Sequence, residues 1–77
     1  MEEVLIDMED EINILDLLVK SGIAPSKSEA RRLVQGNGIS FNSIKETNDT
    51  RIFKKEEINN LVISKGKKTH IKVNLNK

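Results

Sequence analysis

One segment decides the fold, and residues 26–38 read Ser26-Lys27-Ser28-Glu29-Ala30-Arg31-Arg32-Leu33-Val34-Gln35-Gly36-Asn37-Gly38. Ser26 and Glu29 fit a capping box, in which the serine hydroxyl accepts a hydrogen bond from the backbone N–H three residues later. Ala30, Leu33 and Val34 then recur at helical spacing and form an apolar stripe. The pattern predicts an amphipathic helix that starts at Ser26 and packs through this stripe.

The polar side of the predicted helix carries positive charge. At about 100° per residue, the arc opposite the stripe holds Ser28, Arg31, Arg32 and Gln35, with Lys27 beside it. Arginine suits phosphate because its planar fork donates two parallel hydrogen bonds. The helix N-terminus adds backbone donors and the positive end of the helix dipole. This arc is therefore a candidate phosphate-binding surface.

A second helix is expected before this one, within residues 12–22. Its apolar residues recur at helical spacing: Ile14, Leu15, Leu18 and Val19. Asp10 or Asn13 can cap its start, and Gly22 stands where a helix ends. We interpret it as a helix that serves packing alone.

The apolar period changes from helical to two at Ile39, after a Gly36-Asn37-Gly38 run whose residue types tolerate positive φ and end the helix. Strands are expected over residues 39–42, 44–46, 61–64 and 70–75, with a tight turn at Asn42-Ser43. One helical turn is expected within residues 53–58, and a hairpin loop at 65–68. Helices segregated from strands predict an α+β fold with two N-terminal helices packed on a small, mainly antiparallel sheet.

The net charge of +1 hides a strong asymmetry along the chain. Residues 1–19 hold seven acids and no base, whereas residues 20–77 hold thirteen bases and five acids. The basic part suggests a polyanionic partner. Residues 1–11 are acidic and lack clean periodicity, so we expect an acidic linker remnant there, disordered in part, followed by one domain over residues 12–77.

The composition argues against catalysis. The 77 residues include no Cys and one His, which leaves no thiolate metal site and excludes most nucleophile–base pairs and clustered metal ligands. His70 alone makes no acid–base machinery. No apolar run approaches the length of a membrane span and no leader is present, so we expect a soluble, cytoplasmic protein without a membrane partner.

A second basic cluster is expected at a hairpin tip, where Lys65, Lys67 and Lys68 are joined by Lys72. Phosphate attraction adds up over contacts, so two clusters on one small domain favour nucleic acid over a merely solvated surface. Trp and Tyr are absent and Phe occurs twice, which disfavours stacking on single strands and favours structured RNA. An acidic protein partner remains the alternative from another class.

A family resemblance rests on one long run, Leu17-Leu18-Val19-Lys20-Ser21-Gly22-Ile23-Ala24-Pro25-Ser26-Lys27-Ser28-Glu29-Ala30-Arg31-Arg32-Leu33-Val34-Gln35-Gly36-Asn37-Gly38-Ile39. It resembles the RNA-binding fold of the small-subunit ribosomal protein called S-four, and more closely the C-terminal domain of bacterial-type tyrosyl-tRNA synthetases. The tip Lys65-Gly66-Lys67-Lys68 favours the synthetase branch. The resemblance covers about residues 12–75.

The resemblance implies a domain that grips tyrosine tRNA on its variable arm and anticodon side. The RNA-binding residues that we predict are Ser26, Lys27, Ser28, Arg31, Arg32, Gln35, Asn37, Gly38, Lys45, Lys65, Lys67 and Lys68. The alternative is an S-four-like module that binds ribosomal or other structured RNA. Asn37 and Ser43 stand where relatives often carry Gly, so we expect both in turns, at some conformational cost.

The same resemblance implies that chemistry occurs elsewhere in a longer chain. ATP and tyrosine would bind a separate catalytic domain that is missing here, so this domain is expected to need no cofactor and to be no enzyme on its own. We expect the isolated domain to be monomeric and the full-length enzyme to be a homodimer through its catalytic domain.

Overall fold

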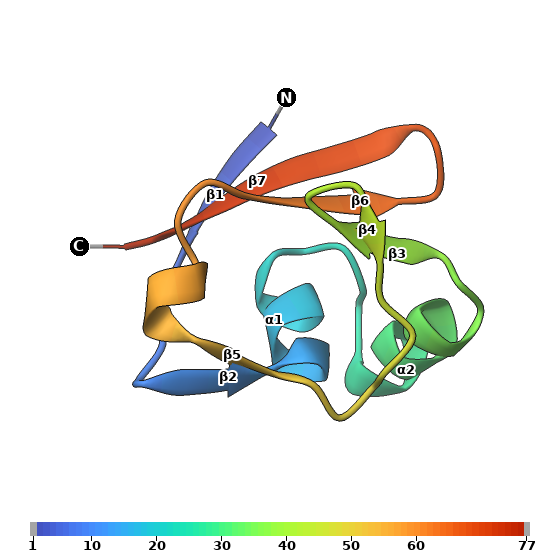
Figure 1. Ribbon diagram of the computed structural model, residues 1–77, viewed down its shortest axis with the longest axis horizontal. Coiled ribbons are helices and arrows are strands. Elements are labelled where there is room, and N and C mark those ends of the chain that lie inside the picture. The colour runs from blue at the N-terminus through green and yellow to red at the C-terminus, as the bar shows by residue number, and fades with distance from the viewer. Residues whose placement is uncertain (1, 77) are drawn as a thin grey trace.

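Two helices lie against one face of a five-stranded sheet in the computed structural model, which describes residues 2–76 (Figure 1). The helices are α1, Ile14–Lys20, and α2, Lys27–Gln35. The strands of this sheet are β1, Glu2–Ile6; β3, Ile39–Phe41; β4, Ile44–Lys45; β6, Leu61–Lys65; and β7, Thr69–Leu75. They follow the order β1-β7-β6-β3-β4, and every pair except the parallel β1–β7 is antiparallel. The predicted α+β class is confirmed.

Helix α2 begins where the capping pattern places it. The Ser26 hydroxyl accepts a hydrogen bond from the Glu29 backbone N–H at 3.4 Å. Ala30 and Val34 are buried, and Leu33 is half-buried against the core. For α1, Asn13 is the cap, because its Oδ1 accepts from the Leu15 N–H at 2.8 Å.

The core lies between the helices and the inner face of the sheet. In β6, Ile63 is fully buried, and in β7 Val73 is fully buried, whereas the intervening side chains point to the opposite face. From α1, Leu17 and Leu18 complete the interior. Within residues 2–76 no helix covers the outer face of the sheet, which is mainly polar apart from Leu5 and Val62 and is open to solvent (Figure 1).

Residues 2–11 correct the predicted linker, because they belong to the fold. Strand β1 pairs in parallel with β7, from Glu2 opposite Ile71 to Ile6 opposite Leu75. Ile6 is only 4% exposed, and Val4 packs against the same core. The segment has too few residues for visible periodicity, and the strand edge that orders it lies at the other end of the chain. Met1 and Lys77, which fall within the predicted linker and domain, lie outside the described residues.

A small second sheet also differs from expectation. It pairs β2, Glu11–Asn13, with β5, Ile52–Lys54, in antiparallel register. The helical turn expected within residues 53–58 is shorter and is the 3-10 turn η1, Lys55–Glu57. Ile12 and Phe53 lie opposite each other and are both buried, so this sheet closes the core below α1.

The turn residues adopt the conformations that their positions demand. Asn42 and Ser43 have φ values of +51° and +72°, as in the two-residue hairpin turns that suit the twist of paired strands. Asn37 has a φ of +61°, at the end of α2. Asn37 and Ser43, which were both expected in turns, therefore lie in the left-handed region, and Ser43 bears the steric cost of a Cβ there.

Candidate nucleic-acid interface

One hydrogen bond joins the two predicted basic clusters. The Gly66 N–H, at the tip of the β6–β7 hairpin, donates to the Gly38 carbonyl at 2.9 Å. Ile39 follows Gly38 directly and lies opposite Lys65 in the β3–β6 ladder. The hairpin tip is therefore placed beside the residues that follow the C-terminal end of α2. Figure 1 shows the hairpin tip and α2 on the same side of the domain.

Lys45 adds a charge on the other side of β3. It lies opposite Ser40, and Ser40 lies opposite Ser64 in the next strand. Ser64 in turn lies opposite His70 in β7, and its Oγ is 2.8 Å from the His70 Nδ1. A polar row thus crosses four strands on the outer face of the sheet, with Lys45 at its end.

The predicted RNA-binding residues are accessible in the structure. Of the twelve, Gly38 is half-buried and the other eleven are exposed. We name this surface the basic face and define it by those twelve residues. Its lysines at the hairpin and on β4 are free of carboxylate partners among residues 2–76: Lys45, Lys65, Lys67 and Lys68.

On α2, residues of the basic face form ion pairs and a hydrogen bond with carboxylates, and the sequence analysis did not predict these contacts. Asp49 Oδ2 accepts from the Gln35 Nε2 at 3.0 Å and lies 3.3 Å from the Arg31 Nε. Lys27 Nζ lies 2.9 Å from Asp16 Oδ1. Ion pairs this exposed contribute at most about 1 kcal/mol each, so a phosphate can displace them. Asp49 comes from the loop after β4, where no spacing signals its position.

Arg32 is the least restrained cation of α2. Its side chain is 80% exposed, and its only carboxylate neighbour within the described chain is Glu29, at 3.8 Å one turn earlier. That contact is visible in the sequence as an i, i+3 pair. Arg32 is therefore free to turn its guanidinium toward a ligand.

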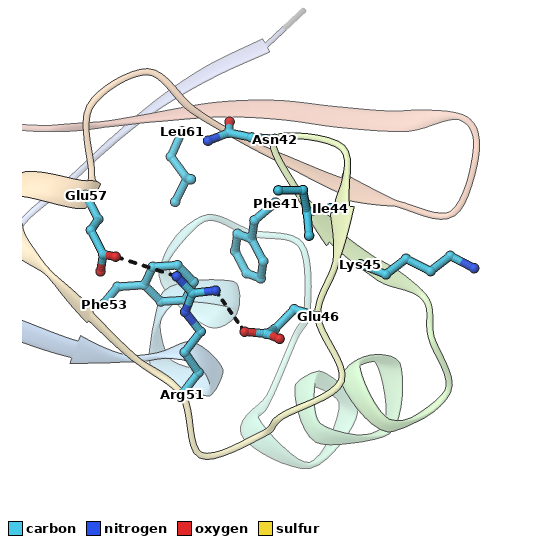
Figure 2. A pocket seen from close by; sticks show the side chains of 9 residues that line it. All are labelled: Phe41, Asn42, Ile44, Lys45, Glu46, Arg51, Phe53, Glu57 and Leu61. Atoms are coloured by element: carbon cyan, nitrogen blue, oxygen red, sulfur yellow. Dashed lines mark hydrogen bonds and ion pairs between the residues drawn. The ribbon is translucent and has the colours of Figure 1, made fainter.

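A cavity of mixed polar and apolar lining adjoins Lys45 under the β3–β4 turn, and Figure 2 shows its lining. Its volume is about 280 Å³. The lining residues are Phe41, Asn42, Ile44, Lys45, Glu46, Arg51, Phe53, Glu57 and Leu61. Of these only Lys45 was predicted as a binding residue, because the others are dispersed over strands, turn and loop.

The residues from 2 to 73 match the tyrosine–tRNA ligase SYY-like C-terminal domain family. This chain belongs to that family. A tyrosine–tRNA ligase of Acetivibrio thermocellus is 42% identical over 71 residues, which cover 90% of this chain and 17% of the relative. The tyrosine–tRNA ligase of Orientia tsutsugamushi (strain Boryong) is 46% identical over 68 residues, or 86% of this chain and 16% of the relative. The tyrosine–tRNA ligase of Helicobacter pylori is 40% identical over 70 residues, which cover 91% of this chain and 17% of the relative.

The family membership confirms the resemblance to tyrosyl-tRNA synthetases. It also extends the resemblance toward the N-terminus, since the match begins at residue 2 and includes β1. The chain spans about a sixth of the length of these curated relatives. Within residues 2–76, neither helix combines the length and the apolar character that a membrane crossing requires.

Proposed function

We propose that this domain binds tRNA, with tyrosine tRNA as its ligand, as part of a tyrosine–tRNA ligase. The hydrogen bond between Gly66 and Gly38 supports the proposal, because it places the hairpin lysines near the end of α2 within a domain of this family. The relatives are named as tyrosine–tRNA ligases, which makes tRNA the polyanion that fits the basic face.

The proposed mechanism is a clamp on the RNA backbone. Arg31 and Arg32 offer planar forks to phosphates along α2, and the hairpin lysines act as mobile point charges at its end. The RNA region contacted in this proposal is the variable arm and the anticodon side, as the resemblance to tyrosyl-tRNA synthetase C-terminal domains implies. None of the twelve residues of the basic face is aromatic, so backbone geometry supplies most of the recognition in this proposal.

The domain supplies binding and no chemistry in this proposal. ATP and tyrosine bind elsewhere in a longer enzyme, and the domain needs no cofactor for its own task. It acts in the cytoplasm, is monomeric in isolation, and gains affinity when the catalytic parts of a homodimer hold the same tRNA.

A salt titration tests the proposal. If about five phosphates are neutralised, the logarithm of the association constant falls with the logarithm of salt concentration at a slope of roughly −3.5 to −4.5. The measurement is fluorescence anisotropy of labelled tyrosine tRNA at several salt concentrations. A flat response contradicts the proposal.

Paired charge variants locate the surface. Lys67→Gln with Lys68→Gln should make the slope shallower by roughly 1.4 to 1.8, because two phosphate contacts are lost. Lys54→Gln with Lys55→Gln removes the same charge at β5 and η1, away from the basic face, and should leave the slope unchanged (Figure 1). If the two pairs change the slope equally, binding depends on the net charge of the domain and not on the basic face. Tighter binding to a ribosomal RNA hairpin of equal length would overturn the choice of tRNA.

A further inference from the structure

The cavity under the β3–β4 turn shares its rim with the basic face. Lys45 belongs to both, and Figure 2 shows its side chain extending away from the cavity, on the side of α2. A phosphate bound at Lys45 would therefore lie outside the cavity, beyond its rim. The volume of about 280 Å³ is at the lower end of ligand pockets and suits a planar fragment.

The interior has the components of a stacking site. The Arg51 guanidinium carbon lies 4.3 Å from the centre of the Phe53 ring, and the Phe41 and Phe53 ring centres are 4.8 Å apart. One face of the guanidinium is thus covered by an aromatic ring. The Arg51 side chain is still 40% exposed, which leaves part of it accessible to a further planar group. Unpaired RNA bases stack on arginine in this way.

Two carboxylates orient the guanidinium and determine which ligand can enter. Glu46 Oε1 accepts from the Arg51 Nη1 at 2.9 Å, and Glu57 Oε1 lies 3.5 Å from Nη2. The lining holds two carboxylates and two cations, but Lys45 extends away from the cavity, so a phosphate beside Arg51 would be repelled by both Glu46 and Glu57. A neutral group that donates hydrogen bonds is favoured instead, because an ionised carboxylate can only accept them.

Glu46 has the acceptor capacity that remains. Its Oε2 accepts no hydrogen bond from the described residues, and its side chain is only 19% exposed. Both carboxylate oxygens of Glu57 already have partners, since Oε1 lies near Arg51 and Oε2 accepts a hydrogen bond from the Lys54 backbone N–H at 2.8 Å. A base that reads Glu46 must present N–H groups side by side. Guanine does so with its N1–H and 2-amino group, whereas the other three bases place an acceptor beside their donor.

We propose that this cavity holds an unpaired guanine base of the bound RNA, an inference that rests on the RNA-binding function proposed above. The base stacks on the accessible part of Arg51. Its N1–H and 2-amino group donate to the Glu46 carboxylate, while its phosphate stays outside at Lys45. The domain thus combines backbone attraction on the basic face with recognition of one base.

A double substitution across the interface tests this. Tyrosine tRNA transcripts carry inosine, which lacks the 2-amino group, in place of each unpaired guanine in turn. The transcript in which inosine replaces the guanine of the cavity should bind the unmodified domain about fivefold to tenfold more weakly than the unsubstituted transcript does. Glu46→Gln should weaken the guanine transcript by about tenfold, and inosine at that position should cause no further loss in this variant.

The sign of the Glu46 effect is diagnostic. Removing a carboxylate makes the domain more positive, so electrostatics alone would strengthen binding. Glu29→Gln is the matched control, because it removes a carboxylate from α2 beside Arg32 and should leave binding unchanged or tighter. If Glu46→Gln behaves like this control and every inosine transcript binds normally, the base site is refuted. A normal salt slope in that experiment would leave the tRNA-binding proposal intact.

A second measurement uses the unmodified domain and holds even if Glu46→Gln fails to fold. The chain has two Phe residues, so the NMR signals of Phe41 and Phe53 can be followed individually. Guanosine 5′-monophosphate should shift both sets of ring protons, and uridine 5′-monophosphate at the same concentration should not. Equal shifts, or no shift with either nucleotide, overturn the guanine assignment.

Discussion

Asp49→Asn should strengthen RNA binding, because Asp49 occupies two groups of the basic face. Its Oδ2 holds both the Gln35 Nε2, at 3.0 Å, and the Arg31 Nε, at 3.3 Å. Asn keeps the size of the side chain and an oxygen that can accept from Gln35. It removes the negative charge that competes with a phosphate for Arg31. The domain should remain folded, since exposed ion pairs contribute little.

The magnitude follows from the geometry. A phosphate bound to the far side of the Arg31 guanidinium would lie about 7 Å from the Asp49 carboxylate, and their repulsion in water at that distance is about 0.6 kcal/mol. Its removal should raise the association constant about threefold when salt is low. At 0.15 M ionic strength the Debye length is about 8 Å, so the gain should shrink to about 1.5-fold.

Fluorescence anisotropy with labelled tyrosine tRNA, at 10 mM and 150 mM salt, measures the effect. Glu56→Gln is the control, because it removes one charge from an exposed residue of η1, on the opposite side of the domain from α2 (Figure 1). The control should change affinity less at both salt concentrations. Weaker binding by Asp49→Asn would refute the reasoning and show that Asp49 positions Arg31 for the RNA. An equal gain from both variants would show that only net charge matters.

Three further predictions concern stability and are measured by urea or thermal unfolding. Ser43→Gly should stabilise the domain by about 0.5–1 kcal/mol, or roughly 2–8 °C in Tm, because Ser43 has a φ of +72°. Asn42→Gly should fail to stabilise, since the Asn42 Oδ1 accepts from the Val62 N–H at 3.0 Å; equal gains would contradict the strain argument. Ile6→Ala should cost about 2–4 kcal/mol, whereas a loose N-terminal segment predicts no change. Ser26→Ala should cost about 0.5–1 kcal/mol through loss of the α2 cap, and an unchanged midpoint would show that the 3.4 Å contact contributes nothing.

The elements that the sequence predicted correctly are those with local causes. The cap at Ser26 and the stripe through Ala30 and Val34 define α2 within nine residues, because helical contacts join neighbours three and four apart. The Asn42-Ser43 turn depends on the backbone preferences of two residues. The positive charges of the basic face were also visible, since long cationic side chains are exposed in almost any fold.

The elements that the sequence could not predict depend on distant partners. The β1 strand needs the edge of β7, and the side chains of Glu3 and Asn74 meet across 71 positions of the chain. The cavity needs Phe41 from β3, Phe53 from β5 and Arg51 from the loop between them. None of these residues shares a periodic pattern with the others.

The sequence by itself therefore determined the helices, the turns, the aliphatic core and the positive charge of this domain. The tertiary structure decided where that charge lies, because the hydrogen bond between Gly66 and Gly38 joins the hairpin to the segment that follows α2 (66 − 38 = 28 positions apart). It also decided that carboxylates reach the same surface, through Asp49, and that Arg51 lies over Phe53. The physical reason is the same in each case: local preferences set the conformation of a segment, and packing of the shared core sets which segments meet.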